Sequence, residues 1–114
     1  MMDNENIKIA IIGLGYVGLP LTIEFARHFD VIGFDINSTR VSQLNSFYDK
    51  TKQLTEQELR DCKVLFTGDV KSISDASVFI ITVPTPIDNN KRPDLSALLE
   101  ASETVASVLR KAIL

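Results

Sequence analysis

Three glycines near the N-terminus have the spacing best suited to chemistry, Gly13-x-Gly15-x-x-Gly18. The apolar run 7–12 directly precedes them, and residues 19–29 carry apolar side chains at helical spacing. A glycine loop between a strand and a helix suits a dinucleotide: Gly13 permits the turn, Gly15 leaves room for a pyrophosphate, and Gly18 lets the helix pack closely on the sheet. The free N–H groups and the positive end of the helix dipole then receive the phosphates.

Asp35 follows this loop at the end of a second apolar run, residues 31–34. A carboxylate about twenty residues past the loop would accept hydrogen bonds from the adenosine ribose hydroxyls, each contributing about 1.5–3 kcal/mol. It would also repel a 2′-phosphate, so the sequence predicts NAD rather than NADP as the cofactor. The alternative is a helix-capping aspartate and glycines that serve only a turn, which requires loop, strand and acid to coincide by chance.

Two further residues are candidates for cofactor contact. Arg40 lies near the start of the second expected helix, where it either reaches the adenosine or is an ordinary exposed arginine; position alone leaves both open. Thr85 stands between two prolines after the expected strand 78–83, so its hydroxyl is held at the carboxyl edge of the sheet, where ligands bind. The alternative there is a stiff loop with an incidental threonine.

The other reactive side chains are expected to be structural. Cys62, the one cysteine, falls near the end of a short helix on the amino-terminal side of the sheet, without a neighbouring histidine or metal-ligand spacing. His28 stands at a helix end that favours a cation. Glu56, Glu58 and Asp61 have the pattern of a solvated helix face. No acid, base and nucleophile combine here into a catalytic set, and no metal site is expected.

The elements that must position these residues alternate between strands and helices. After the second strand we expect a helix capped by Asn37 or Ser38 and then a loop over 46–53. A helix over 55–61, opened by a capping box, leads to a strand over 64–66 and to helical turns over 69–75. The strand 78–83, a proline-rich loop over 84–93 and a helix over 95–114 complete the order. This alternation predicts an α/β fold: a Rossmann-type doubly wound parallel sheet, truncated, with strand order 3-2-1-4.

Length and charge limit the class of protein. The 114 residues with a net charge of -3 suffice for one domain, so residues 1–114 are expected to form an N-terminal NAD-binding domain. Basic clusters, a signal peptide and a membrane-length apolar run are absent from the sequence, which predicts a cytoplasmic protein without nucleic-acid or membrane partners. The last helix ends on apolar residues without a cap, so we expect a fragment of a longer chain. Its expected apolar face comprises Leu95, Leu98, Leu99, Val105, Val108 and Leu109.

Several stretches resemble the UDP-glucose/GDP-mannose dehydrogenase family, in the same order over nearly the whole chain. They are Lys8–Pro20, Gly33–Asn37, Arg40-Val41 and Val83–Pro86. A second set is most similar to the N-acetylhexosamine branch, which includes the Vi-polysaccharide type enzymes. It comprises Pro86-Ile87, Pro93–Ser96 and Ala101–Val105.

The resemblance implies an activity for the full-length protein. Such enzymes oxidise the C6 alcohol of UDP-N-acetylglucosamine or UDP-N-acetylgalactosamine to a carboxylate with two NAD+, through an enzyme-bound thiohemiacetal and thioester, and serve capsule, O-antigen or related polysaccharides. A homodimer or larger assembly is expected. Carried over by position, Tyr16 and Val17 would meet NAD through the loop backbone, Asp35 and Arg40 would hold the adenosine ribose, and Thr85 would also contact the cofactor.

The family's catalytic cysteine, its lysine and asparagine partners and the glutamate near the nicotinamide lie downstream of Leu114. The fragment alone is therefore expected to be inactive, and Cys62 inherits no role. A non-catalytic NAD-sensing module is the alternative function, but it gives no reason for Val83–Pro86. A methyltransferase that uses S-adenosylmethionine is disfavoured by the glycine spacing and by Gly18.

Overall fold

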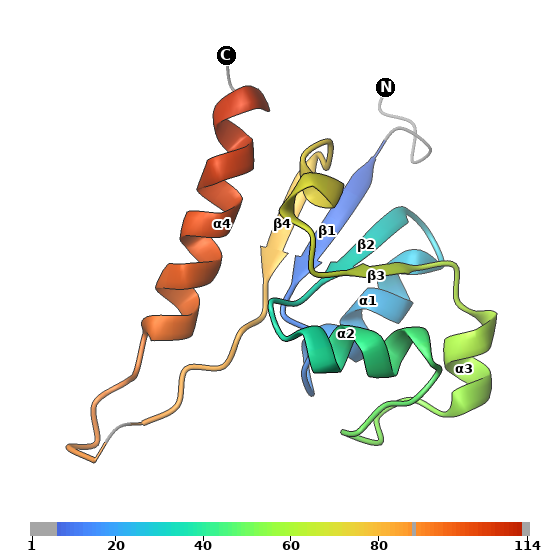
Figure 1. Cartoon of the computed structure of the whole chain (residues 1–114), viewed down its shortest axis with the longest axis horizontal. Coiled ribbons are helices and arrows are strands. Elements are labelled where there is room, and N and C mark those ends of the chain that lie inside the picture. The colour runs from blue at the N-terminus through green and yellow to red at the C-terminus, as the bar shows by residue number, and fades with distance from the viewer. Residues whose placement is uncertain (1–6, 88, 113–114) are drawn as a thin grey trace.

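The computed structural model describes residues 7–87 and 89–112. Figure 1 shows a single layer of strands between helices. The elements in chain order are β1 (Lys8–Ile12), α1 (Gly18–Ala26), β2 (Asp30–Phe34), α2 (Ser38–Asn45), α3 (Glu56–Asp61), β3 (Leu65–Thr67), the 3-10 helix η2 (Val70–Ile73), β4 (Val78–Ile81) and α4 (Ser96–Ala112).

The four strands form a parallel sheet in the order β3-β2-β1-β4, which confirms the predicted order. β1 lies at the centre, where Ile9 pairs with Val31 of β2 and with Val78 of β4. A central parallel strand is covered on both faces and both edges, which is why the β1 sequence is almost entirely apolar. The chain changes sides of β1 between β3 and β4. This reversal is the switch point, where parallel sheets bind ligands.

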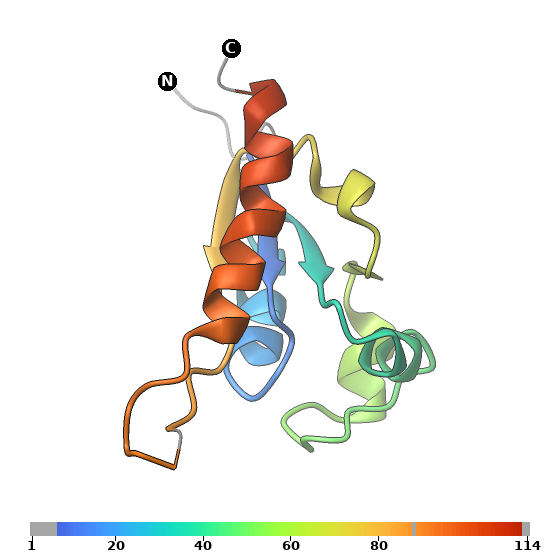
Figure 2. The ribbon, with the colours of Figure 1, turned by 60° about the vertical axis from the view of Figure 1, so that its left-hand side comes forward.

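Helices cover both faces of the sheet, as expected for a doubly wound fold. On one face, Ile9 and Ile11 of β1 pack with α1, and Leu44 of α2 and Leu59 of α3 extend this layer beneath β3. On the other face, Ala10 and other apolar residues of β1 and β2 pack against η2 and α4. Figure 2 shows α4 in front of the sheet and α1 behind it.

The inward face of α4 differs from the expected one. Leu95 and Leu99 are exposed to 46% and 61%, whereas Ala101, which the expected face omitted, is buried with Val105 and Val108. The spacing 101, 105, 108 is one helical stripe, and Leu99 lies off it. The small side chain of Ala101 allows the helix to approach the end of the sheet. The apolar pattern was correct in period but wrong for these two leucines.

Other element ends shifted by a few residues. α1 ends at Ala26 rather than at residue 29, and β4 ends at Ile81 rather than at residue 83. The N–H of Thr82 still donates to the carbonyl of Ile12 over 2.8 Å, but Pro84 cannot continue the ladder. Residues 113 and 114 of the last expected helix lie outside the described residues. Every described helix falls short of the length and apolarity that crossing a bilayer requires.

Candidate cofactor-binding site

A cavity of about 300 Å³ opens at the carboxyl edge of the sheet. Four segments meet there: the turn after β1, the end of β2, the end of β4 and the first turns of α4. These are the segments that Figures 1 and 2 show together at the lower end of the sheet. The lining residues are Ile12, Gly13, Leu14, Gly15, Phe34, Asp35, Ile36, Thr82, Val83, Pro84, Ala97 and Ala101.

The three glycines of the turn have three different surroundings. Gly13 has a φ of +103°, a conformation that side chains rarely tolerate. A Cβ on Gly18 would collide with the carbonyl oxygen of Gly13 and the hydroxyl of Thr82. A Cβ on Gly15 would meet no heavy atom within 4 Å. Gly13 and Gly18 are therefore required by the protein itself, whereas the space at Gly15 is left for something that approaches the backbone.

The turn also presents unused hydrogen-bond donors. Among the described residues, no acceptor bonds to the N–H groups of Gly15, Tyr16 and Val17, and α1 has no side-chain cap at its N-terminus. Tyr16 and Val17 have exposed side chains that lie outside the cavity lining. The unused N–H groups of these two residues lie beside the cavity wall formed by Gly15. Free N–H groups at a helix start suit a phosphate.

Asp35 is fixed at the cavity wall by two backbone groups. Its Oδ2 accepts the N–H of Leu14 over 3.0 Å, and its Oδ1 accepts the N–H of Asn37 over 2.9 Å. Each carboxylate oxygen still has a free lone pair. The geometry leaves Asp35 able to accept two ribose hydroxyls while it stays in place.

Arg40 is buried behind the glycine turn, so it is not the exposed arginine that its helical position allowed. Its Nε donates to the carbonyl of Leu14 over 2.7 Å, and its Nη1 donates to Oδ1 of Asp49 over 2.9 Å. Nη2 is buried without a partner in the described part of the chain. The predicted contact of Arg40 with the adenosine ribose stays a prediction.

Asp49 is a residue that the sequence did not single out, because it lies in a polar segment expected to be an irregular loop. Its side chain is 0% exposed. Burial by itself would raise its pKa, but hydrogen bonds from the Thr51 hydroxyl, the Leu54 N–H, the Arg40 guanidinium and the Thr51 N–H lower the pKa to about 2. An aspartate followed by a threonine two residues on is the one local signal that could have indicated such an anchored turn.

Thr82, rather than Thr85, lies on the wall of the cavity. The Thr82 hydroxyl donates to the carbonyl of Gly13 over 2.7 Å and joins the end of β4 to the glycine turn. Thr85 is exposed and lies outside the lining residues. Its predicted contact with the cofactor therefore needs a ligand that extends past the cavity, and it stays a prediction.

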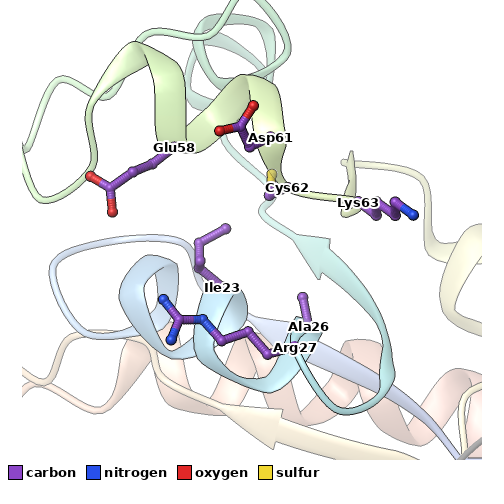
Figure 3. Close-up of a pocket in the computed structure, with 7 residues that line it drawn as sticks. All are labelled: Ile23, Ala26, Arg27, Glu58, Asp61, Cys62 and Lys63. Carbon is purple, nitrogen blue, oxygen red and sulfur yellow. The ribbon is translucent and has the colours of Figure 1, made fainter.

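A second cavity, of about 380 Å³, lies between α1 and α3 at the opposite edge of the sheet. Figure 3 shows its lining residues: Ile23, Ala26, Arg27, Glu58, Asp61, Cys62 and Lys63. The Cys62 thiol donates to the carbonyl of Leu59, and burial raises its pKa. A raised pKa disfavours the reactive thiolate. No group of three or more metal-ligating side chains occurs among the described residues.

The NAD binding domain of the UDP-glucose/GDP-mannose dehydrogenase family matches residues 7–114. The chain belongs to this family. The family assignment confirms both the resemblance and the predicted cofactor, NAD. The open space at Gly15, the free N–H groups of the turn and the fixed carboxylate of Asp35 are the features that fit this cofactor.

Two bacterial 6-dehydrogenases are similar to this chain over nearly its whole length. UDP-N-acetyl-D-glucosamine 6-dehydrogenase of Salmonella typhi is 48% identical over 97% of this chain, and its counterpart from Pseudomonas aeruginosa is 45% identical over 94%. Each match covers 26% of the relative. The chain therefore spans about a quarter of the length of these relatives.

A solved structure agrees with the fold. The UDP-D-ManNAc dehydrogenase of Pyrococcus horikoshii superposes with a TM-score of 0.82 at 37% identity. The superposition covers 90% of this chain and 26% of that one. The doubly wound fold predicted from the sequence is thereby confirmed.

Proposed function

We propose that this chain is the NAD-binding domain of a UDP-N-acetylhexosamine 6-dehydrogenase. The full-length enzyme would oxidise the C6 alcohol of a UDP-N-acetylhexosamine to a uronic acid for surface polysaccharide synthesis. This oxidation removes four electrons, so it consumes two NAD+ and one water. The observation that carries the proposal is the cavity itself, where Asp35 and Gly15, whose N–H is the first free donor of the glycine turn, both line the wall.

The residues of this chain bind and orient; they do not react. The N–H groups of Gly15, Tyr16 and Val17 would bind the pyrophosphate, and Asp35 would accept the adenosine ribose hydroxyls and exclude a 2′-phosphate. Gly13 and Gly18 shape the turn, and Arg40 and Thr85 are further candidates at its adenosine and outer sides. Bound NAD+ supplies the hydride acceptor.

The substrate class rests on the relatives. Those from Salmonella typhi and Pseudomonas aeruginosa are named for UDP-N-acetyl-D-glucosamine, and the relative from Pyrococcus horikoshii is named for UDP-N-acetyl-D-mannosamine. The groups that would contact the sugar and perform catalysis are placed, in this proposal, in the remaining three quarters of the enzyme, as is the interface of a homodimer or larger assembly. A cytoplasmic location, where nucleotide sugars and NAD are available, is part of the same proposal.

A chimera tests the proposal directly. This chain would replace the matching N-terminal quarter of the Salmonella typhi enzyme, and NADH formation with UDP-N-acetyl-D-glucosamine would be followed at the nicotinamide absorbance band. We expect turnover from the chimera and none from the 114-residue chain alone. An NAD-sensing module in place of a dehydrogenase domain would bind NAD+ but leave the folded chimera inactive.

A further inference from the structure

One residue of the glycine turn, Leu14, is held through both of its backbone polar groups. The N–H of Leu14 donates to Asp35, and its carbonyl accepts the Nε of Arg40 over 2.7 Å. No other donor reaches this carbonyl among the described residues. Leu14 directly precedes Gly15, whose N–H begins the row of free donors. The Leu14 carbonyl and the Gly15 N–H belong to the same planar peptide group and point in opposite directions. The bond from Arg40 therefore sets the direction of this first free donor.

The Arg40 side chain that holds this peptide is itself held by one anion. Asp49 accepts its Nη1 over 2.9 Å, and both side chains are at least nine-tenths buried. The remaining nitrogen, Nη2, has no partner in the described part of the chain. Within the described ranges, Asp49 is thus the only charged group that both balances and aims this guanidinium.

The position of Asp49 does not depend on Arg40. Its carboxylate also accepts the N–H groups of Thr51, Gln53 and Leu54 over 2.8–2.9 Å, and the Thr51 hydroxyl over 2.6 Å. Four bonds from its own loop therefore fix Asp49 as an anchor, and Arg40 spans from this anchor to the glycine turn. Asp49 lies outside the residues that line the cavity.

We propose that Asp49 is a positioning residue for the cofactor: through Arg40 it holds the peptide group between Leu14 and Gly15 so that the Gly15 N–H faces the phosphates. The inference rests on the proposed site at this turn. It assigns a role in affinity for NAD to the loop between α2 and α3. This loop lies wholly within the described residues, and none of it lines the cavity. If Asp49 had only a structural role, its substitution would lower the stability of the fold and leave the affinity for NAD+ unchanged.

The test compares NAD+ affinity and thermal stability in the 114-residue chain by calorimetry. We expect Asp49→Asn to lower NAD+ affinity about tenfold, the effect of one charge-assisted hydrogen bond, because the amide cannot balance the guanidinium. Thr55→Ala is the matched control, since the Thr55 hydroxyl caps α3 in the same segment and does not contact Arg40. It should lower the melting temperature and leave affinity unchanged.

A double-mutant cycle then shows whether Asp49 acts through Arg40. Arg40→Met removes both bonds of the guanidinium, so adding Asp49→Asn to it should cause no further loss of affinity. Additive losses would overturn the inference. If Asp49→Asn does not fold, Arg40→Lys serves instead: one ammonium cannot span Asp49 and the Leu14 carbonyl in the same geometry, so affinity should still fall.

Two kinds of result distinguish a failure of this inference from a failure of the proposed function. Wild-type affinity in Asp49→Asn, or a higher affinity because the released guanidinium attracts the phosphates, would overturn the positioning role and leave the NAD site intact. A wild-type chain that does not bind NAD+, or that binds it as well after Asp35→Ala, would overturn the proposed site and the inference together.

Discussion

The two cavities of this domain differ in the residues that line them more than in their volumes. The larger one, between α1 and α3, is lined largely by charged residues that are exposed to solvent. The smaller one, at the carboxyl edge, is lined by apolar residues, by the glycine turn and by one carboxylate that two N–H groups hold in place. Groups that converge and are already fixed distinguish a binding site from a gap between helices.

The reason for the difference is topological. The carboxyl edge collects the ends of β1, β2 and β4 at the point where the strand order reverses, so backbone groups from separate segments are brought together there. The α1–α3 cavity lies where a helix and a short capped helix pass one another. The following substitutions test this comparison, in order of decreasing expected effect.

Gly18→Ala should have the largest effect, a loss of about 3 kcal/mol in the free energy of unfolding. The new methyl group would collide with the Gly13 carbonyl and the Thr82 hydroxyl, and backbone cannot yield as a side chain does. Urea denaturation followed by circular dichroism measures the loss. Unaltered stability would show that α1 does not need its close approach to the sheet.

Asp35→Ala should lower NAD+ affinity about 10- to 100-fold, because it removes the acceptor of the ribose hydroxyls. Asp69→Ala is a matched control: Asp69 also follows a strand and accepts a backbone N–H, that of Lys71, but it lies outside the cavity. Calorimetric titration of both variants gives the comparison. Equal affinities would remove Asp35 from the site.

Acid should remove about 2 kcal/mol of stability through Asp49. Its pKa is about 2 in the folded chain against an ordinary value of 3.8. As the pH falls from about 4 to 2, the unfolded chain takes up this proton first, so the free energy of unfolding decreases in that window. Urea denaturation at several pH values should show this decrease in the wild type, and a smaller one in Asp49→Asn.

Gly15→Ala should weaken NAD+ binding about tenfold without loss of stability. A methyl group at Gly15 meets no protein atom, but it would enter the space left for the pyrophosphate. Comparing its urea midpoint and NAD+ affinity with those of Gly18→Ala separates the two glycines. A loss of stability at Gly15 equal to that at Gly18 would contradict the assignment of this space to a ligand.

Cys62→Ser, in the larger cavity, should have the smallest effect. It replaces the thiol that donates to the Leu59 carbonyl with a hydroxyl, which is also a donor, and should leave NAD+ affinity, and turnover in the complete enzyme, unchanged. Since burial raises the pKa of the thiol, Cys62 should also react with iodoacetamide more slowly at neutral pH than a free cysteine does. A complete enzyme that loses its activity on Cys62→Ser would give the α1–α3 cavity a function.

The backbone plan was predictable because local signals agree with one another. The glycine spacing, the apolar strand before it and Asp35 after it each identify the same βαβ unit, and the capping box at Thr55 and Glu58 is present as expected. These signals depend on residues close in sequence. The strand order follows from them through the handedness of parallel crossovers.

The residues that support the cavity wall from behind were not predictable, because their positions depend on contacts between segments far apart in the sequence. Asp49 meets Arg40 of the distant helix α2, and its own segment is polar and lacks a period. Thr82 faces the turn through the alternation of β4, whereas the neighbouring prolines drew attention to Thr85. In α4, the stripe through Val105 and Val108 includes Ala101 and not Leu99, so the error there came from ranking Leu99 by its hydrophobicity rather than by its place on the helix.

The walls of the carboxyl-edge cavity join segments that lie far apart in the sequence, among them the turn after β1 and the helix α4 with Ala97 and Ala101. During synthesis, β1 and β2 can pair early, but β4 must still cross over to the free edge of β1. The cavity is therefore complete only once β4 and α4 are in place, so a bound cofactor stabilises the finished sheet. Until then the apolar residues at the carboxyl edge lie uncovered, which exposes the nascent domain to misassembly.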